Sequence, residues 1–241
     1  MQLIKFRLKD GSSLVFLNLN AIFNSGLADL SDISVVPNSI EHPKNITPHK
    51  TRNKKMRILH AGGFKKSKGL LVSLEIAKKL KELNLDFEMS LAGFVYKTAV
   101  STNYLKYLKS KAIEYNIHNN IKFFENNDSL DELLNGNDYL IHPSETEGLP
   151  RVVMEAMMYK LVVIANPVGG VIELINNHVS GYITDFNSVD DYVYYLLMIH
   201  KNQKLADEIT TRAKDVINNG YTIEQQLQAF KSSLKWSPTY L

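Results

Sequence analysis

HPSETEGLPRVVMEAMMYKLVVIANPVGG, residues 142–170, is the stretch that most clearly indicates how this chain folds. Two carboxylates, Glu147 and Glu155, stand on either side of a Gly-Leu-Pro turn. The mostly apolar segment after the turn predicts a helix, and the β-branched run LVVIANP predicts a buried strand. A turn, a helix and a strand in this order are typical of one unit of a parallel α/β sheet.

Strands and helices alternate on both sides of this stretch. Upstream, strands are predicted at MRILHAGG, DFEMSLAG, NIKFFEN and NDYLIHP, and helices at KGLLVSLEIAKKLKEL, VSTNYLKYLKSKAIEYN and DSLDELLNG. Downstream, the helix GVIELINN and the strand SGYITD precede three helical segments between residues 187 and 235. This alternation predicts an α/β fold, a doubly wound, Rossmann-like parallel sheet with helices on both faces.

The first 51 residues follow a different pattern. Two apolar runs, residues 2–8 and 13–19, flank an Asp10-Gly11 turn and predict a two-stranded β-ribbon. Residues 38–55 are polar, contain two prolines and are typical of a linker. We therefore predict a small N-terminal appendage with its linker over residues 1–51, and one main domain over residues 52–241.

The composition excludes several classes of protein. The 241 residues include no cysteine, which excludes disulfides, cysteine-ligated metals and thiol catalysis. A net charge of +3 is too mild to indicate nucleic acid as a partner. The N-terminus lacks a signal-peptide pattern, and no apolar run approaches the roughly 18 residues that span a bilayer. A cytoplasmic protein is therefore expected.

Glycines and short polar residues gather at the predicted carboxyl ends of the strands, where open parallel sheets bind ligands. These ends read HAGGF, LAGF, HPSETEGLP and NPVGG. Glycine lets the backbone approach a ligand closely, and helix N-termini favour anions. Any one of these glycines is equally well explained by the needs of a tight turn. The four ends together favour a phosphate-bearing ligand, although neither G-x-G-x-x-G nor a P-loop is present.

The helix after the turn leaves two interpretations of its acidic residues open. Pro150 suits the first helical position, which places Glu147 where the helix dipole favours a negative charge. Glu155 lies one turn further on and needs a partner, because burying an unpaired carboxylate is costly. Arg151, four residues earlier, is one candidate partner. A ligand with two adjacent hydroxyls, such as a ribose, is the other.

Residues 144–185 resemble the sugar-nucleotide-binding half of retaining glycosyltransferases with the two-domain GT-B architecture, the large family 4, group 1 type. Glu147 and Glu155 reproduce that family's two glutamates with seven residues between them, and Gly169 to Glu173 match its Gly-Gly-x-x-Glu turn. SVVPNSIE is similar to the family's interdomain linker, and ILHAGGFKKSKGLLVSLEIA is similar to its phosphate loop and following helix. The resemblance runs from about residue 33 to the end of the chain.

The resemblance implies an enzyme that transfers a sugar from a nucleoside diphosphate sugar, most commonly a UDP-sugar, to a glycan or lipid-linked acceptor. The setting that it implies is cell-surface polysaccharide or glycoconjugate synthesis, with retained stereochemistry and no cofactor or metal ion. Glu147 is then the candidate catalytic residue beside the donor sugar, and Glu155 would bind the ribose. The other implied donor-binding residues lie in two turns: Gly62, Gly63 and Lys68, then Gly148 and Leu149.

Two departures separate this chain from the family pattern. Gly63 stands where the family carries an arginine, so Lys65 or Lys66 would have to complete the cationic clamp on the diphosphate. The family's acceptor-binding domain is also far longer than residues 1–51, which resemble a remnant of it, its last strand and linker. His60 and His142 are therefore expected to fill strand ends, not to act as the acceptor-side catalytic histidine.

This second departure leaves two hypotheses for function. In the first, the protein is a glycosyltransferase at the inner face of the membrane, and its acceptor half is a separate chain or is missing from this sequence. The expected partner is then a separate N-terminal-half chain or a second copy in a homo-oligomer. In the second, the chain is a non-catalytic module that binds a nucleotide sugar and transfers nothing. Residues 221–234 resemble the terminal helix that packs across the interdomain hinge in such enzymes, so its apolar face is expected to be exposed or covered by another chain.

Overall fold

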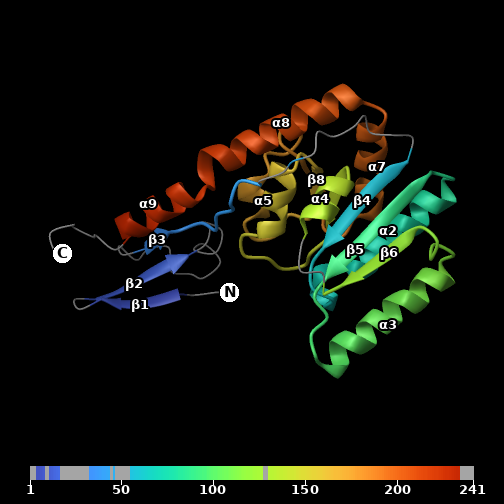
Figure 1. Ribbon diagram of the computed structural model, residues 1–241, viewed down its shortest axis with the longest axis horizontal. Helices are drawn as coiled ribbons and strands as arrows, with labels where there is room; N and C mark the ends of the chain where they lie inside the picture. The colour runs from blue at the N-terminus through green and yellow to red at the C-terminus, as the bar shows by residue number, and fades with distance from the viewer. Residues whose placement is uncertain are drawn as a thin grey trace.

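Residues 4–8, 11–16, 33–43, 46, 55–126 and 130–233 are the part of the chain that the computed structural model describes. These residues form a six-stranded parallel sheet flanked by helices and, from the N-terminal segments, a three-stranded sheet (Figure 1). The larger sheet confirms the predicted α/β fold.

The large sheet has the strand order β6-β5-β4-β7-β8-β9, and every neighbouring pair is parallel. Its strands are β4 (Met56–Ala61), β5 (Phe87–Gly93), β6 (Ile121–Glu125), β7 (Tyr139–His142), β8 (Val162–Ala165) and β9 (Tyr182–Ile183). The chain builds outward from β4 to β6 and then returns to β7 on the other side of β4. This reversal makes the carboxyl ends of β4 and β7 the switch point, where sheets of this kind bind ligands.

Helices cover both faces of this sheet. They are α2 (Leu70–Glu82), α3 (Ala99–Glu114), α4 (Asp131–Gly136), α5 (Arg151–Met158), α6 (Val171–Leu174), α7 (Val189–His200) and α8 (Gln203–Gly220), with a short 3-10 turn, η1 (Lys66–Lys68), before α2. Buried side chains of α2, α3 and α7 form one hydrophobic core with the sheet, and those of α4, α5 and α6 form the other. Because α8 contributes to both cores, it ties the two layers together.

Adjacent residues of the central strands point into opposite cores. In β4, Ile58 packs in the core with α2, whereas Leu59 packs in the core with α5. Ile141 and Leu140 of β7 alternate in the same way, and all four side chains are fully buried. Strands that are buried on both faces read as unbroken apolar runs, which is why the period-2 alternation of a half-exposed strand is absent from the sequence.

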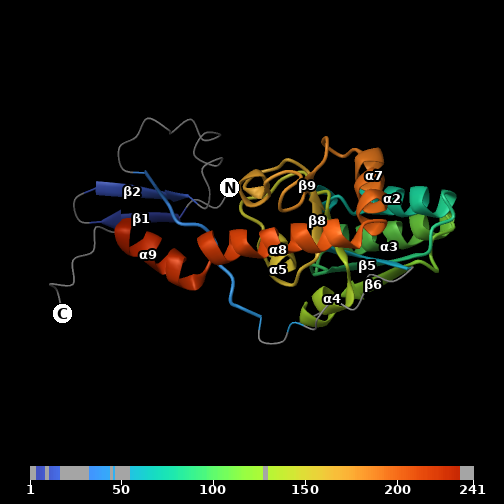
Figure 2. The same ribbon diagram turned by 90° about the horizontal axis from the view of Figure 1, so that it is seen from above.

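The small sheet contains β1 (Ile4–Leu8) and β2 (Gly11–Phe16), which pair antiparallel, and β3 (Ile33–Val35), which pairs parallel to β2. The hairpin confirms the predicted ribbon, and β3 adds a third strand. α9 (Ile223–Ser233) contacts β3, and α8 and α9 follow one another toward the small sheet (Figure 2). The turn residue Asp10 and the expected boundary near Arg52 lie outside the described residues.

The segment between the two sheets is held by the C-terminal part of the chain. The N–H of Ile40 donates to the carbonyl of Tyr221 at 3.2 Å. Gln226 of α9 donates to the carbonyl of Pro37 at 2.7 Å and accepts a hydrogen bond from the hydroxyl of Ser39 at 2.8 Å. We call residues 37–40 together with Tyr221 and Gln226 the linker junction.

Two predicted helix boundaries are wrong in detail. Pro150 precedes the helix instead of opening it, because its backbone is extended, with φ −75° and ψ 114°, and α5 begins at Arg151. The fixed φ of proline is compatible with both positions, so the residue type alone does not choose between them. The helix expected over GVIELINN is only the single turn Val171–Leu174, because Ile175 is already extended.

Candidate functional site

A cavity of about 380 Å³ lies at the carboxyl ends of β4, β5 and β7, which include the switch point of the sheet. We call it the donor cavity, after the role that the sequence resemblance implies for its residues. Four predicted site residues line it: Gly62 and Gly63 after β4, Lys68 at the end of η1, and Glu147 in the turn before α5. Lys68 and Glu147 are 79 positions apart in the sequence, so only the parallel topology brings them together.

Close packing between neighbouring loops explains two of the glycines at the strand ends. A methyl group on Gly93 would collide with the carbonyl oxygen of Gly62. Gly169 has a left-handed φ of +51°, and a methyl group there would collide with the carbonyl of Glu147. Gly62 is different, because a Cβ built on it would make only an ordinary contact, 3.6 Å from the ring of His60. Loop packing therefore accounts for Gly93 and Gly169 but not for Gly62.

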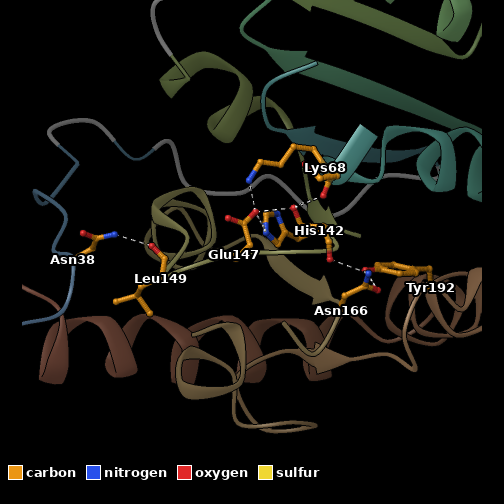
Figure 3. Close-up of polar contacts among 9 residues, drawn as sticks. Asn38, Lys68, His142, Glu147, Leu149, Asn166 and Tyr192 are labelled. Carbon is orange, nitrogen blue, oxygen red and sulfur yellow. Dashed lines mark hydrogen bonds and ion pairs between the residues drawn. The ribbon is translucent and has the colours of Figure 1, made fainter. Parts of the chain in front are cut away.

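One carboxylate oxygen of Glu147 has three polar neighbours (Figure 3). The Nζ atom of Lys68 and the hydroxyl of Ser144 each donate to Oε1 at 2.7 Å. Nε2 of His142, the last residue of β7, lies 3.0 Å from the same oxygen, within ion-pair distance but without a hydrogen bond. The side chains of Glu147 and Lys68 are 11% and 28% exposed, so solvent screens this ion pair only partly.

These neighbours set the charges of the site. Burial raises the pKa of Glu147, but His142, Lys68 and Ser144 together lower it more, to about 2. Glu147 is therefore ionised at neutral pH. Burial, with smaller effects of His142 and Lys68, lowers the pKa of His60 to about 3, so this imidazole is neutral.

The two histidines do occupy strand ends, as expected. His60 in β4 is buried, and its Nδ1 lies 2.7 Å from the hydroxyl of Ser73 in α2. His142 is also buried, but it lines the donor cavity and faces Glu147. The cavity-side position of His142 goes beyond the expected packing role.

A buried amide beneath the cavity holds the turn in place. Asn166, directly after β8, is fully buried, and its Nδ2 donates to the carbonyl of Ser144 at 3.1 Å and to Oδ1 of Asn187 at 2.7 Å. Its Oδ1 accepts hydrogen bonds from the hydroxyls of Tyr192 at 3.1 Å and Thr184 at 3.2 Å. Polar contacts therefore lead from α7 through Asn166 and Ser144 toward the carboxylate and Lys68 (Figure 3).

Gly148 and Leu149 lie beside the donor cavity and do not line it. The carbonyl of Gly148 accepts a hydrogen bond from the N–H of Gly170 at 2.6 Å. The carbonyl of Leu149 accepts one from Nδ2 of Asn38 at 2.8 Å, and the Leu149 side chain is buried (Figure 3). These bonds tie the turn to the loop after β8 and to the linker junction.

Glu155 also lies outside the lining of the donor cavity. Its carboxylate is 28% exposed and 3.9 Å from Nη2 of Arg151, whose side chain is 63% exposed. Burial raises the pKa of Glu155, the charge of Arg151 opposes that rise, and Asp131 adds to it. The predicted Arg151 partner is therefore present, but the separation is too long for a hydrogen bond and the pair is weak.

The two lysines expected to complete a cationic clamp face elsewhere. Lys65 and Lys66 line a second cavity of about 1080 Å³, between the start of α2 and the start of α3. Nζ of Lys65 lies 4.0 Å from the centre of the Tyr96 ring, a cation–π contact. Neither lysine lines the donor cavity beside Lys68.

Two absences bear on the chemistry of the described residues. No group of three or more His, Cys, Asp or Glu side chains among them is arranged to hold a metal ion. In the same part of the chain, no helix is both long enough and apolar enough to cross a membrane. The groups that line the donor cavity include a partly buried ammonium, a guanidinium, a carboxylate and glycine backbone, which suit a ligand with phosphates and hydroxyls.

Sequence reasoning missed three residues that shape the site: His142, Ser144 and Asn166. Asn166 had a usable signal, since it directly follows the four fully buried apolar residues of β8. A polar residue that ends such a strand is either exposed or hydrogen-bonded within the protein. The direction in which His142 and Ser144 face had no comparable signal.

Comparison with known proteins gives the family. Residues 41–216 match the family model of the glycosyl transferases group 1, and the chain belongs to that family. It is 25% identical over 201 residues to an uncharacterized glycosyltransferase of Haemophilus influenzae, covering 81% of this chain and 54% of the relative. It is 25% identical over 186 residues to the lipopolysaccharide 1,2-N-acetylglucosaminetransferase of Salmonella typhimurium, covering 74% and 48%. The chain thus spans about half the length of the curated relatives it matches.

Solved structures share the fold. Alr3699/HepE of Anabaena, in complex with UDP-glucose, matches this chain with a TM-score of 0.79 and 16% sequence identity, over 92% of this chain and 63% of that one. At this level of identity the likeness concerns the fold alone. The α/β architecture with its six-stranded parallel sheet is therefore that of GT-B glycosyltransferase structures.

Proposed function

We propose that this member of the group 1 family is the donor-binding half of a retaining, family 4 type glycosyltransferase. The proposed reaction transfers a hexose from a UDP-sugar to a glycan or lipid-linked acceptor. The observation that carries the proposal is the donor cavity, where Lys68 and Glu147 are 2.7 Å apart beside the Gly62-Gly63 loop at the switch point of the sheet.

The proposed roles follow from the chemistry of each group. Lys68 and the backbone of Gly62 and Gly63 bind the diphosphate and stabilise it as it leaves the anomeric carbon of the sugar. Glu147, ionised at neutral pH, accepts hydrogen bonds from hydroxyls of the donor sugar and is the candidate catalytic residue. Glu155, one turn further along α5, accepts hydrogen bonds from the ribose.

The turn Gly148-Leu149 supplies the backbone beside the sugar. Its two carbonyls already have partners in Gly170 and Asn38, so the turn is held in one shape before any ligand arrives. In this proposal a preformed turn presents its amides to the donor at little conformational cost.

The comparisons support the class of donor and the setting. A structural neighbour is described with UDP-glucose, and a curated relative acts in lipopolysaccharide synthesis. We accordingly propose a UDP-sugar donor and a role in cell-surface polysaccharide assembly, in the cytoplasm at the inner face of the membrane. Residues 1–51 form the acceptor-side appendage of the domain 52–241, and the acceptor groups come from another part of the protein, a separate chain or a second copy.

A second candidate is a module that binds the nucleotide sugar without transferring it. The observation in its favour is that the matched region covers only about half of each curated relative. Donor binding is common to both candidates, and transfer separates them.

Calorimetric titration of the chain with UDP, GDP, ADP and their sugars tests donor binding. We expect saturable binding of UDP and its sugars, and a loss of about 1–3 kcal/mol in Glu155→Gln, which removes a charge-assisted hydrogen bond. Glu208→Gln is the matched control, because Glu208 forms a similar i,i+4 pair with Arg212 at 3.8 Å on α8. Absence of binding by the folded chain would contradict both candidates. Binding without sugar transfer, in the presence of a lipid-linked acceptor and the acceptor half, would favour the module.

A further inference from the structure

The donor cavity has two cationic side chains among the described residues that line it. One is Lys68, and the other is Arg151, the first residue of α5. A nucleoside diphosphate brings two or three negative charges, so a single lysine leaves part of that charge without a partner. Because Lys65 and Lys66 line the second cavity, Arg151 is the available second cation.

The two cations are held very differently. Lys68 makes a 2.7 Å hydrogen bond to a carboxylate that is 11% exposed. Arg151 is 63% exposed, and its contact with Glu155 is 3.9 Å, beyond hydrogen-bond distance. An exposed pair at this distance contributes little, so separating it costs little. The guanidinium is therefore easily drawn away from Glu155.

The position of Arg151 relative to Glu155 matters as much as the weakness of their ion pair. Arg151 lines the donor cavity, whereas Glu155, one helical turn later, does not. The arginine is in contact with both the cavity and the carboxylate that is proposed to bind the ribose. In a nucleoside diphosphate the diphosphate and the ribose are directly bonded, so one ligand can engage both members of the pair.

We propose that Arg151 is the second diphosphate-binding cation and that nucleotide binding opens its pair with Glu155. The guanidinium moves to the diphosphate, where its planar fork fits two phosphate oxygens, and Glu155 is released to the ribose hydroxyls. This inference rests on the proposed donor site. It makes Arg151 the second cation that Lys65 and Lys66, in the other cavity, do not supply.

The test measures the phosphate-dependent part of affinity. UDP, GDP and ADP are titrated against the chain beside uridine, guanosine and adenosine. For the diphosphate that binds, we expect Arg151→Gln to weaken affinity about ten-fold or more, the loss typical of a hydrogen bond between charged groups. Affinity for the matching nucleoside should stay within about two-fold, because Arg151 does not bind the base or the ribose.

Two further variants make the test specific. Arg212→Gln breaks the comparable pair with Glu208, 3.8 Å apart on α8 and away from the donor cavity, and should bind the diphosphate as the wild type does. Arg151→Lys keeps the charge but loses the fork, so its affinity for the diphosphate should fall between those of the wild type and Arg151→Gln. Unchanged thermal unfolding of each variant shows that the comparison concerns binding.

Other outcomes overturn the inference in distinguishable ways. Equal loss of diphosphate and nucleoside in Arg151→Gln would mean that Arg151 acts only through Glu155. Full diphosphate affinity in Arg151→Gln, with binding still weakened in Glu155→Gln, would refute the role of Arg151 and leave the donor site intact. Failure of the folded wild-type chain to bind any diphosphate would refute both proposals.

Discussion

The carboxylate of Glu147 is held in its charged form by its neighbours despite its burial. The ionisation of this one side chain therefore affects the stability of the domain in acid. In the unfolded chain Glu147 titrates near 4.5, whereas in the folded protein its pKa is about 2. Because the folded pKa is the lower one, ionised Glu147 stabilises the fold above pH 4.5, and this contribution disappears as pH falls toward 2.

We expect this contribution to be of order 3 kcal/mol at neutral pH. In Glu147→Gln, the free energy of unfolding should therefore fall less between pH 6 and pH 3 than it does in the wild type. Urea unfolding at several pH values measures the difference. Glu125→Gln is the control, since Glu125 forms an exposed pair with Lys109 at 2.6 Å. Parallel pH profiles for wild type and Glu147→Gln would show that the neighbours do not hold the charge.

Some residues of the site could be predicted from the sequence and others could not. Lys68 and Glu147 could be chosen from the sequence because each is a charged residue at a strand or helix end that matches a known motif. His142, the last residue of β7, could not be chosen in this way. Its contact with Glu147 depends on which way its buried ring faces. Lys65 and Lys66 show the converse, since neighbouring lysines on one loop line a different cavity.

At the scale of elements, Asn166 connects the end of β8 to the turn before α5 and to α7. Replacing it with alanine leaves the hydroxyls of Tyr192 and Thr184 and the carbonyl of Ser144 without their buried partner. We expect Asn166→Ala to lower the free energy of unfolding by about 2–4 kcal/mol. Tyr192→Phe removes a single donor from the same network and should cost only about 1 kcal/mol.

Urea unfolding of the two variants checks this order. Equal losses in Asn166→Ala and Tyr192→Phe would mean that the hydroxyl of Tyr192, and not the amide, holds the loops together. The order expected here follows from counting the buried hydrogen bonds that each substitution removes.

Helices and strands could be predicted from the sequence where apolar and amphipathic segments alternate over a long stretch. The parallel sheet and its larger helices follow from apolar runs separated by amphipathic segments, and the two cores confirm that arrangement. Short elements could not be predicted, because a single helical turn such as α6 is too short to show a periodic pattern. Pro150 was assigned to the wrong side of the helix boundary because its preferred φ fits both sides.

In the molecule as a whole, the linker junction connects the segment between the two sheets to the C-terminal part of the chain. Gln226 makes two hydrogen bonds across it, to Pro37 and Ser39. Gln226→Ala should therefore speed hydrogen exchange at the amide of Ile40, which donates to Tyr221, by roughly ten-fold. Gln203→Ala is the control, because Gln203 bonds Asp207 on its own helix, remote from the junction. Exchange at Ile40 that is unchanged by Gln226→Ala would show that α9 does not restrain the linker.

The junction continues into the site. Asn38 donates to the carbonyl of Leu149, so the linker is bonded directly to the turn that carries Glu147 (Figure 3). The linker and the turn are therefore joined by one hydrogen bond, with no intermediate element.

The pairing of charges around the donor cavity has a consequence for competition. Lys68 is paired with Glu147 and Arg151 with Glu155, so the four charges cancel two by two. A small anion such as inorganic phosphate can bind Lys68 only by leaving the mostly buried carboxylate of Glu147 without this partner. In the proposed function, a nucleotide sugar would replace several partners at once, because its diphosphate would bind the cations while its hydroxyls would bind the carboxylates. The proposed site would thus favour a ligand that satisfies both signs of charge together over free phosphate.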